Sequence, residues 1–189
     1  MTDQELSDYL AAKKAAVVHL SHHAVIDPAR PIFPDDLHQA IAKRDEFNLS
    51  CVVVWPGHEM DLPGSVGVIF KPLCANVISV SNTDSGSMML ADGTDGSAGV
   101  ALSSEALAST FQVVGAYNEW RVRGAEVAGI FVAVLGDIYV KKEQEFDAGG
   151  DKFKAIAATN VALAEVIAAF PHHPIFTMGI EGLVAVPRF

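Results

Sequence analysis

The sequence predicts a single α+β domain in which a mixed, mainly antiparallel sheet is packed by about four helices. Short apolar runs rich in β-branched residues and bounded by Pro or Gly occupy the middle of the chain, which is typical of strands. Segments with helical spacing of apolar residues lie near both ends. With 189 residues the chain can bury one hydrophobic core, and no repeat or linker divides it.

The amino-terminal segment carries a helix-start signal. Thr2 is followed three residues later by Glu5, which is the spacing of a capping box. Apolar residues then recur at helical spacing and predict one long helix; they are Leu6, Leu10, Val17, Leu20 and Ala24. A strand at residues 15–20 is the competing interpretation, because Val17 and Val18 are β-branched, but the unbroken helical pattern favours the helix.

A loop with three prolines at residues 27–34 separates this helix from a second one, expected at residues 36–46. Pro34 suits the first helical turn. Asp35 and Asp36 suit the positive end of the helix dipole.

Strands are expected next at residues 51–55, 66–70 and 76–80. The first is a continuous apolar run, so we expect it in the centre of the sheet. The short connection between the other two predicts antiparallel neighbours. Residues 87–91 and 98–102 are predicted to pair across an Asp-Gly turn.

A serine-capped helix is expected at residues 103–115. Two strands follow at residues 118–122 and 126–135, and Arg123 and Gly124 between them predict a hairpin. We expect the longer of these strands in the centre of the sheet.

Residues 138–140 either extend that strand or begin another, and residues 141–147 are interpreted as a charged connection. The tail at residues 175–186 is expected to hold one or two short strands.

An alanine-rich helix is predicted at residues 151–170, following Gly149 and Gly150 and capped by Asp151. Small residues on this helix would let it pack closely on the buried strand around residues 130–134.

Composition limits the classes of partner. A formal charge of −10 disfavours nucleic acid and anionic membranes, because Lys and Arg dominate binding to phosphates. Mean hydropathy is +0.29, yet no apolar run approaches the roughly 20 residues that span a bilayer. The first residues are acidic and polar, unlike a secretory signal, so we expect a cytoplasmic protein. The excess of apolar residues over 19% charged residues predicts a homo-oligomer.

The two cysteines, Cys51 and Cys74, form neither a CxxC motif nor a Cys/His cluster. We expect them to be reduced, buried and structural.

A ligand-binding loop is the first functional hypothesis. Residues 77–99 run from a strand into Ser, Asn, Thr, Asp and Gly, residue types that allow close backbone approach and local hydrogen bonds. The candidate ligand-binding residues of this loop are Ser85, Gly86, Gly93 and Gly96. Neither a dinucleotide fingerprint nor a P-loop is present, and no motif identifies a cofactor. A polar turn without a ligand is the favoured alternative.

Histidines form a second group of candidates. On a helix His19 and His23 would share a face four residues apart, which is a ligand geometry for metals. The same face also carries Glu5 and Asp8, so a solvated role is favoured and no metal site is predicted.

His58 and Glu59, which follow the expected central strand, are candidates for a catalytic group. Its partners would be Asp84 with Ser85 or Ser87, or alternatively His22 and His23. The nucleophile-elbow motif GxSxG does not occur, so the sequence adds little support to this idea.

Arg121 and Arg123, beside Glu119, Trp120 and Tyr117, are candidates for binding an acidic or planar ligand. On an alternating strand these charges more commonly form a solvated face, and this alternative is favoured.

The leading functional hypothesis is a small-molecule-binding or sensory module whose pocket lies against residues 81–99, with Arg121 or Arg123 facing an anionic group. The alternatives are a hydrolase or metal-assisted enzyme that uses His58 and Glu59, and a structural oligomer without a pocket.

Overall fold

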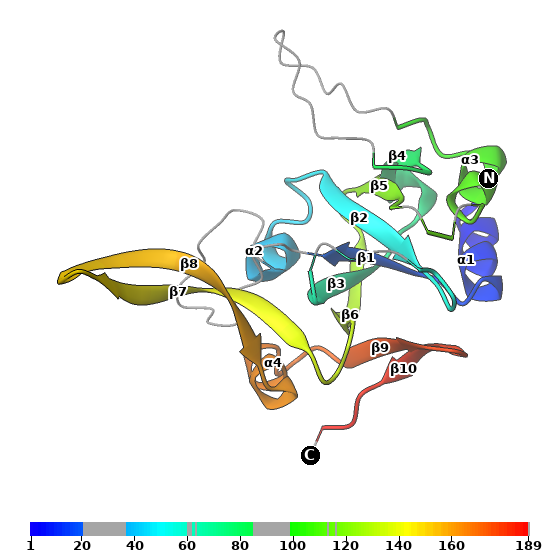
Figure 1. Cartoon of the computed structure of the whole chain (residues 1–189). Coiled ribbons are helices and arrows are strands. Elements are labelled where there is room, and N and C mark those ends of the chain that lie inside the picture. Colours follow the sequence, from blue (N-terminus) through cyan, green and yellow to red (C-terminus); the bar gives the residue numbers. More distant parts are fainter. Residues whose placement is uncertain are drawn as a thin grey trace, which may run out of the picture.

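The structure is a computed structural model and describes residues 1–20, 37–59, 62, 64–84, 99–112, 114–115 and 117–188. These residues form four α-helices, ten strands and one 3₁₀ turn (Figure 1). In chain order they are α1 (Asp3–Ala12), β1 (Ala16–Leu20), α2 (Leu37–Ala42), β2 (Leu49–Val54), β3 (Val66–Lys71), the 3₁₀ turn (Cys74–Asn76), β4 (Val77–Ser81), α3 (Ser104–Thr110), β5 (Glu119–Val122), β6 (Glu126–Val132), β7 (Ile138–Ala148), β8 (Asp151–Val161), α4 (Leu163–Ala169), β9 (Ile175–Gly179) and β10 (Gly182–Ala185).

Eight strands form one mixed sheet in the order β10-β9-β6-β3-β1-β2-β5-β4. Neighbouring strands run antiparallel except β6 and β9, which are parallel. The expected mixed sheet with about four helices therefore agrees with the described residues. The strand predicted to be central, β2, lies between β1 and β5.

A short link between β5 and β6 forces this sheet to curl. Only residues 123–125 join the two strands, so the Cα atoms of Val122 and Glu126 lie at most about 14 Å apart. The four strand spacings between β5 and β6 would measure roughly 19 Å on a flat sheet. Ala125, within the link, is buried in the same cluster as Val17 and Trp120, which indicates that the sheet curls toward that side.

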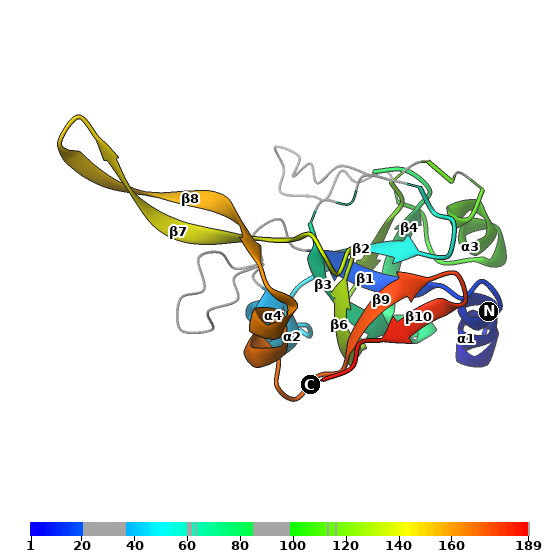
Figure 2. The same ribbon diagram turned by 60° about the horizontal axis from the view of Figure 1, so that its bottom comes forward.

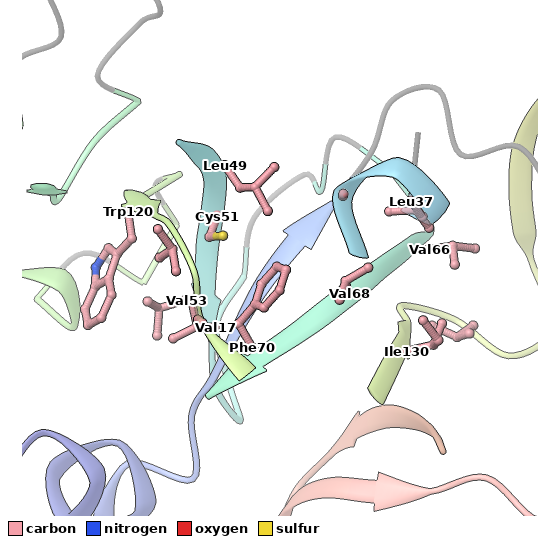
Figure 3. Packing of buried hydrophobic residues seen from close by; sticks show 14 of the residues in the cluster. Val17, Leu37, Leu49, Cys51, Val53, Val66, Val68, Phe70, Trp120 and Ile130 are labelled. Atoms are coloured by element: carbon pink, nitrogen blue, oxygen red, sulfur yellow. The ribbon is translucent and has the colours of Figure 1, made fainter. Parts of the chain in front are cut away.

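The two faces of the sheet carry separate clusters of buried apolar side chains. The first cluster receives residues from every described helix, including Leu6 of α1, Leu37 of α2, Leu107 of α3 and Val166 of α4. Figure 3 shows strand residues of this cluster, with Leu37 beside Val66 of β3. The second cluster lies on the opposite face and contains Ala16, Val18, Leu20, Val52, Val54, Ile69 and Phe131. The described helices therefore cover one face of the sheet.

The amino-terminal helix is shorter than predicted. Its capping box is confirmed, because the Thr2 hydroxyl accepts from the Glu5 N–H at 3.2 Å and the Glu5 carboxylate accepts from the Thr2 N–H at 2.6 Å. The helix ends at Ala12, and residues 16–20 form a strand that pairs with both β2 and β3. This pairing buries Val17 and Val18 completely or nearly so, a tertiary gain that a local helical pattern does not contain.

The predicted helices at residues 36–46 and 103–115 correspond to α2 and α3, and both end earlier than expected. The Ser103 hydroxyl caps α3 by accepting from the Ala106 N–H at 3.1 Å. No helix in the described ranges is both long and apolar enough to cross a bilayer.

Two predicted strand pairings are wrong although the strands exist. β3 and β4 are not neighbours, since β1, β2 and β5 lie between them. The hairpin of residues 118–135 does not form either, because β5 pairs with β2 and β4 whereas β6 pairs with β3 and β9. Arg123 and Gly124 instead donate their N–H groups to the carbonyls of Asn76 and Arg44, at 2.8 and 2.9 Å, so the link is held by other segments.

The alanine-rich helix at residues 151–170 is also wrong. Its first half is β8, which pairs in register with β7, and only its second half is the helix α4. Gly149 and Gly150 have φ values of +70° and +98° and form a two-residue turn between Ala148 and Asp151. The strand around residues 130–134 is buried as predicted only at residues 130–132, because Ile130, Phe131 and Val132 are at most 1% exposed whereas Val134, beyond the end of β6, is 57% exposed.

Strands β7 and β8 form a separate two-stranded ribbon that projects away from the rest of the molecule (Figures 1 and 2). The residues interpreted as a charged connection, 141–147, belong to β7.

Candidate ligand-binding site

The candidate site is a group of polar side chains on the sheet face that bears no described helix. On β5, Trp120 and Val122 belong to the first apolar cluster, so Glu119 and Arg121 lie on the opposite face. The register places Arg121 opposite Ser50 of β2 and Ser79 of β4. We call Ser50, Tyr117, Glu119 and Arg121 the polar cluster.

The polar cluster is held together by short contacts. The Ser50 hydroxyl donates to Oε1 of Glu119 at 2.6 Å, and Nη2 of Arg121 lies 3.1 Å from the same oxygen. The Glu119 and Arg121 side chains are only 5% and 12% exposed. An ion pair this far from solvent is weakly screened, so the attraction between its two charges is stronger than that of a surface pair.

Arg121 retains binding capacity that the described residues do not fill. Its Nε and Nη2 atoms are buried, and neither has a hydrogen-bond acceptor among the described residues. The contact of Nη2 with Glu119 is ionic and lacks the alignment of a hydrogen bond. A buried donor without an acceptor costs about 1–3 kcal/mol. The Nε–Nη2 edge is also an edge of the guanidinium fork that can hold a carboxylate or phosphate with two parallel hydrogen bonds.

Tyr117 places a phenol beside this pair. Burial, and secondarily the nearby charges of Glu119 and Asp84, raise the pKa of Tyr117 to about 12, although a hydrogen bond with Ser50 acts in the opposite direction. The phenol therefore stays protonated at neutral pH, and because the single Ser50 O–H donates to Glu119, the Tyr117 O–H donates to the Ser50 oxygen. Asp84 is exposed and follows strand β4. It lies close enough to Tyr117 for its charge to raise the pKa of the phenol, so it is a neighbour of the polar cluster.

Strand β5 is fixed on both sides of the polar cluster. The Asn118 side chain accepts from the Val53 N–H at 2.8 Å and donates to the Val53 carbonyl at 2.9 Å, so it links the two strands two residues beyond the Cys51–Trp120 pair. The Trp120 indole donates to the Thr110 hydroxyl of α3 at 3.1 Å. These buried contacts hold Glu119 and Arg121 in register.

The two cysteines take no part in this chemistry. Cys51 is fully buried on the opposite face, where desolvation raises the pKa of its thiol and keeps it protonated. Cys74 is partly exposed, and desolvation together with Asp3 raises the pKa of its thiol as well. Both are free, as predicted, though only Cys51 is buried.

The two predicted arginines have different environments. Arg121 belongs to the polar cluster, so the favoured interpretation of a solvated face is wrong for Arg121 and Glu119. Arg123 is exposed, and its Nε donates to the Asp45 carbonyl at 2.7 Å.

The loop candidates Ser85, Gly86, Ser87, Gly93 and Gly96 lie outside the described residues. The described ends of this segment lie beside the polar cluster. The register places Ser79 and Ser81 of β4 opposite Arg121 and Glu119, and Val100 forms a bridge with Val80.

His58 and Glu59 lie at a different place. The His58 ring stacks on Trp55 with centroids 3.7 Å apart and planes 8° apart, next to a cavity of about 500 Å³ that Phe131 and Met178 also line. Glu59 is exposed, and its N–H donates to the Val114 carbonyl at 2.9 Å. The catalytic role of these two residues stays a prediction.

The prediction that His19 and His23 share one face of a helix is wrong, because His19 lies in strand β1. His19 is 6% exposed, and its Nδ1 is 2.7 Å from the Ser50 carbonyl. His22 and His23 are outside the described ranges, within which no group of three His, Cys, Asp or Glu side chains is arranged to hold a metal.

Sequence reasoning missed Ser50. Ser50 is the one polar residue in a strand that is otherwise apolar from residue 49 to residue 54. A hydroxyl in a buried strand needs a hydrogen-bond partner, and this need indicates a polar contact on that face.

Comparisons with protein-family models, with curated proteins and with solved structures found no match to this chain.

Proposed function

We propose that this chain binds a small anionic molecule, with the carboxylate or phosphate of the ligand held by Arg121. The observation that supports the proposal is the pair of buried guanidinium donors, Nε and Nη2, without an acceptor among the described residues. A ligand oxygen on each donor would remove the cost of leaving it unpaired.

The neighbours of Arg121 suit such a ligand. Glu119 contacts the guanidinium at Nη2, and Nε has no hydrogen-bond acceptor among the described residues, so an anion can approach the guanidinium from the Nε side. The Tyr117 hydroxyl oxygen and the Glu119 carboxylate can accept from a hydroxyl or amino group of the ligand. The described residues on either side of the expected ligand loop at residues 85–98 adjoin the polar cluster, since Ser81 pairs with Glu119 and Val100 bridges to Val80.

Thermal unfolding with probe anions tests the proposal. Sodium acetate and sodium phosphate are compared with sodium chloride at equal ionic strength. A probe present at 100 times its Kd stabilises the folded state by about 2.7 kcal/mol, which raises Tm by roughly 5–10 °C for a chain of this size.

Arg121→Gln and Arg123→Gln form a matched pair, since each removes one arginine from the same segment. The proposal predicts that Arg121→Gln abolishes stabilisation by the probe anion and that Arg123→Gln retains it. Equal responses in the two variants, or no response of the wild type beyond that to chloride, would contradict it.

A further inference from the structure

The contact between helix α2 and the end of helix α4 borders a small cavity. The His38 ring of α2 stacks on the Phe170 ring, with centroids 4.5 Å apart and planes 25° apart. Figure 2 shows the two helices beside each other. The cavity measures about 170 Å³, and three histidines are among the described residues that line it: His38, His172 and His173. None of the described lining residues belongs to the polar cluster around Arg121.

Arg188, in the segment after β10, places a permanent positive charge beside this cavity. Its Nη1 donates to the Pro171 carbonyl at 2.5 Å, and its Nη2 donates to the Phe170 carbonyl at 2.9 Å and to the His173 carbonyl. All three acceptors belong to residues that line the cavity. The guanidinium therefore occupies carbonyl oxygens that would otherwise repel a negative group, and it does not lose its charge near neutral pH.

No carboxylate lines the described part of the cavity. Its described lining includes neither Asp nor Glu. Helix α2 has no acidic residue, and the one carboxylate of α4, that of Glu165, lies toward the other end of the helix. There Glu165 accepts from the Ala162 N–H at 2.9 Å. The charge around the cavity is therefore of one sign.

The His173 imidazole is affected by this excess of positive charge. Burial, followed by the charges of His172, Arg188 and His38, lowers the pKa of His173. Every charged group in this set is cationic, so each of them repels a proton on His173. A negative ion in the cavity would reverse the effect, because an opposite charge nearby favours the protonated imidazole.

We propose that this cavity binds a small inorganic oxyanion such as sulfate or phosphate, held by His172 and His173 beside the positive charge of Arg188. The oxygens of such an ion accept hydrogen bonds, and a neutral imidazole supplies one N–H donor whereas a protonated imidazole supplies two. Proton uptake by His173 and binding of the ion therefore favour each other, so the affinity for the ion rises as the pH falls. This site does not depend on anion binding at Arg121.

Size and charge favour an oxyanion over the other ligands that histidines bind. A water molecule takes up about 30 Å³ in the liquid, so the cavity has room for roughly five molecules of that size. Ligands of drug size need about 300 Å³ or more. Arg188 would repel a metal ion, and no group of three His, Cys, Asp or Glu side chains in the described ranges is arranged to hold one. His172 is exposed, so a small ion can reach the cavity from solvent.

NMR titration of the histidine ring protons between about pH 5 and pH 8 tests the proposal in the full chain. Sodium sulfate is the probe, because sulfate keeps its charge over this range, and sodium chloride of equal ionic strength is the reference. We expect the midpoint of the His173 titration to be higher in sulfate by at least about 0.5 pH unit, a roughly threefold change in proton affinity. His58 lines a different cavity, so its titration should be the same in both salts.

His172→Gln and His58→Gln form a matched pair, since each removes one imidazole from a segment between regular elements. The Kd of sulfate is followed through the His173 resonance at about pH 6. We expect His172→Gln to raise this Kd at least about fivefold and His58→Gln to leave it unchanged.

A His173 midpoint that is the same in the two salts, or equal sulfate Kd values for the two variants, would overturn the proposal. The wild-type titration decides the point even if a variant fails to fold. His173 and Arg121 are followed by separate resonances, so failure at one site does not bear on the other.

Discussion

Nη2 of Arg121 lies 3.1 Å from Oε1 of Glu119, two residues away on the same face of β5, and both side chains are nearly inaccessible to solvent. The Ser50 hydroxyl donates to the same oxygen, so one carboxylate oxygen serves both neighbours. Glu119 therefore fixes the position of the guanidinium without using its Nε.

Glu119→Gln should destabilise the fold because it leaves the Arg121 charge buried without a counter-charge. Breaking a buried ion pair from one side costs about 3 kcal/mol or more. Chemical denaturation measures the loss. Glu181→Gln is the control, since Glu181 is 78% exposed in its pair with Lys14, and its denaturation midpoint should not change. Equal midpoints for the two variants would show that the buried pair contributes no more to the free energy of unfolding than the exposed pair does.

Asn118→Ala should weaken the β2–β5 ladder. Asn118 is 1% exposed and serves both backbone groups of Val53, so its loss leaves a buried N–H and a buried carbonyl unpaired. At about 1–3 kcal/mol for each group, the expected loss is roughly 2–6 kcal/mol in the free energy of unfolding. Asn160→Ala removes an exposed amide that donates to Asp137 and should cost less than about 0.5 kcal/mol. A small loss at Asn118 would mean that water reaches Val53.

Tyr117 should give the protein a distinct alkaline titration. Its folded pKa is raised to about 12 from an ordinary value of 10, mainly by burial. The folded state holds this proton more tightly than the unfolded state, so the associated stability is complete below pH 10 and is lost as the pH rises toward 12. Denaturation from pH 9 to pH 11.5 should show a steeper decline for the wild type than for Tyr117→Phe. Parallel declines would contradict a buried Tyr117 phenol.

Gly67→Ala should be costly because two strands approach each other closely there. A Cβ atom at Gly67 would lie 2.7 Å from both the His19 carbonyl oxygen and Cγ1 of Val18. Overpacking of this kind costs about 1–3 kcal/mol. Gly136→Ala is the control, because nothing lies within 4 Å of its added Cβ, and it should change stability by less than about 0.5 kcal/mol. Urea denaturation of both variants decides the point, and equal stabilities would refute the close approach of β1 and β3.

The strands with continuous β-branched runs could be predicted from sequence, and their partners could not. The apolar residues of β2 and β3 indicate burial on both faces, which holds whatever the neighbouring strands are. The partner of β5 depends on Asn118 and on the carbonyls of Arg44 and Asn76, contacts between segments distant in sequence. A glycine turn signal at Gly124 is equally compatible with a hairpin between adjacent strands and with a connection between strands that are not adjacent.

Local propensity failed where pairing outweighs it. The alanines at residues 155, 157 and 158 favour a helix, yet the ladder with β7 places them in β8. The Gly149-Gly150 pair is compatible with a tight hairpin turn and with a break before a helix, and the β7–β8 register shows that it forms the turn.

The candidate site was predicted in part. Alternation along β5 correctly placed Glu119 and Arg121 on one face, but burial of that face depends on the whole fold and was not visible in the local pattern. Ser50 belongs to the polar cluster because the pairing of β2 with β5 places it opposite Arg121, and the sequence does not specify this pairing.

The side-chain Nε–Hε resonances of the arginines, followed by NMR during titration with sodium acetate and sodium phosphate, test the central claim most directly. The account predicts a saturable shift of the Arg121 resonance with at least one of these anions, no shift in sodium chloride of equal ionic strength, and an unchanged Arg123 resonance. An Arg121 resonance that does not respond, or one that moves no more than that of the exposed Arg123, would contradict the assignment of Arg121 as the anion-binding residue.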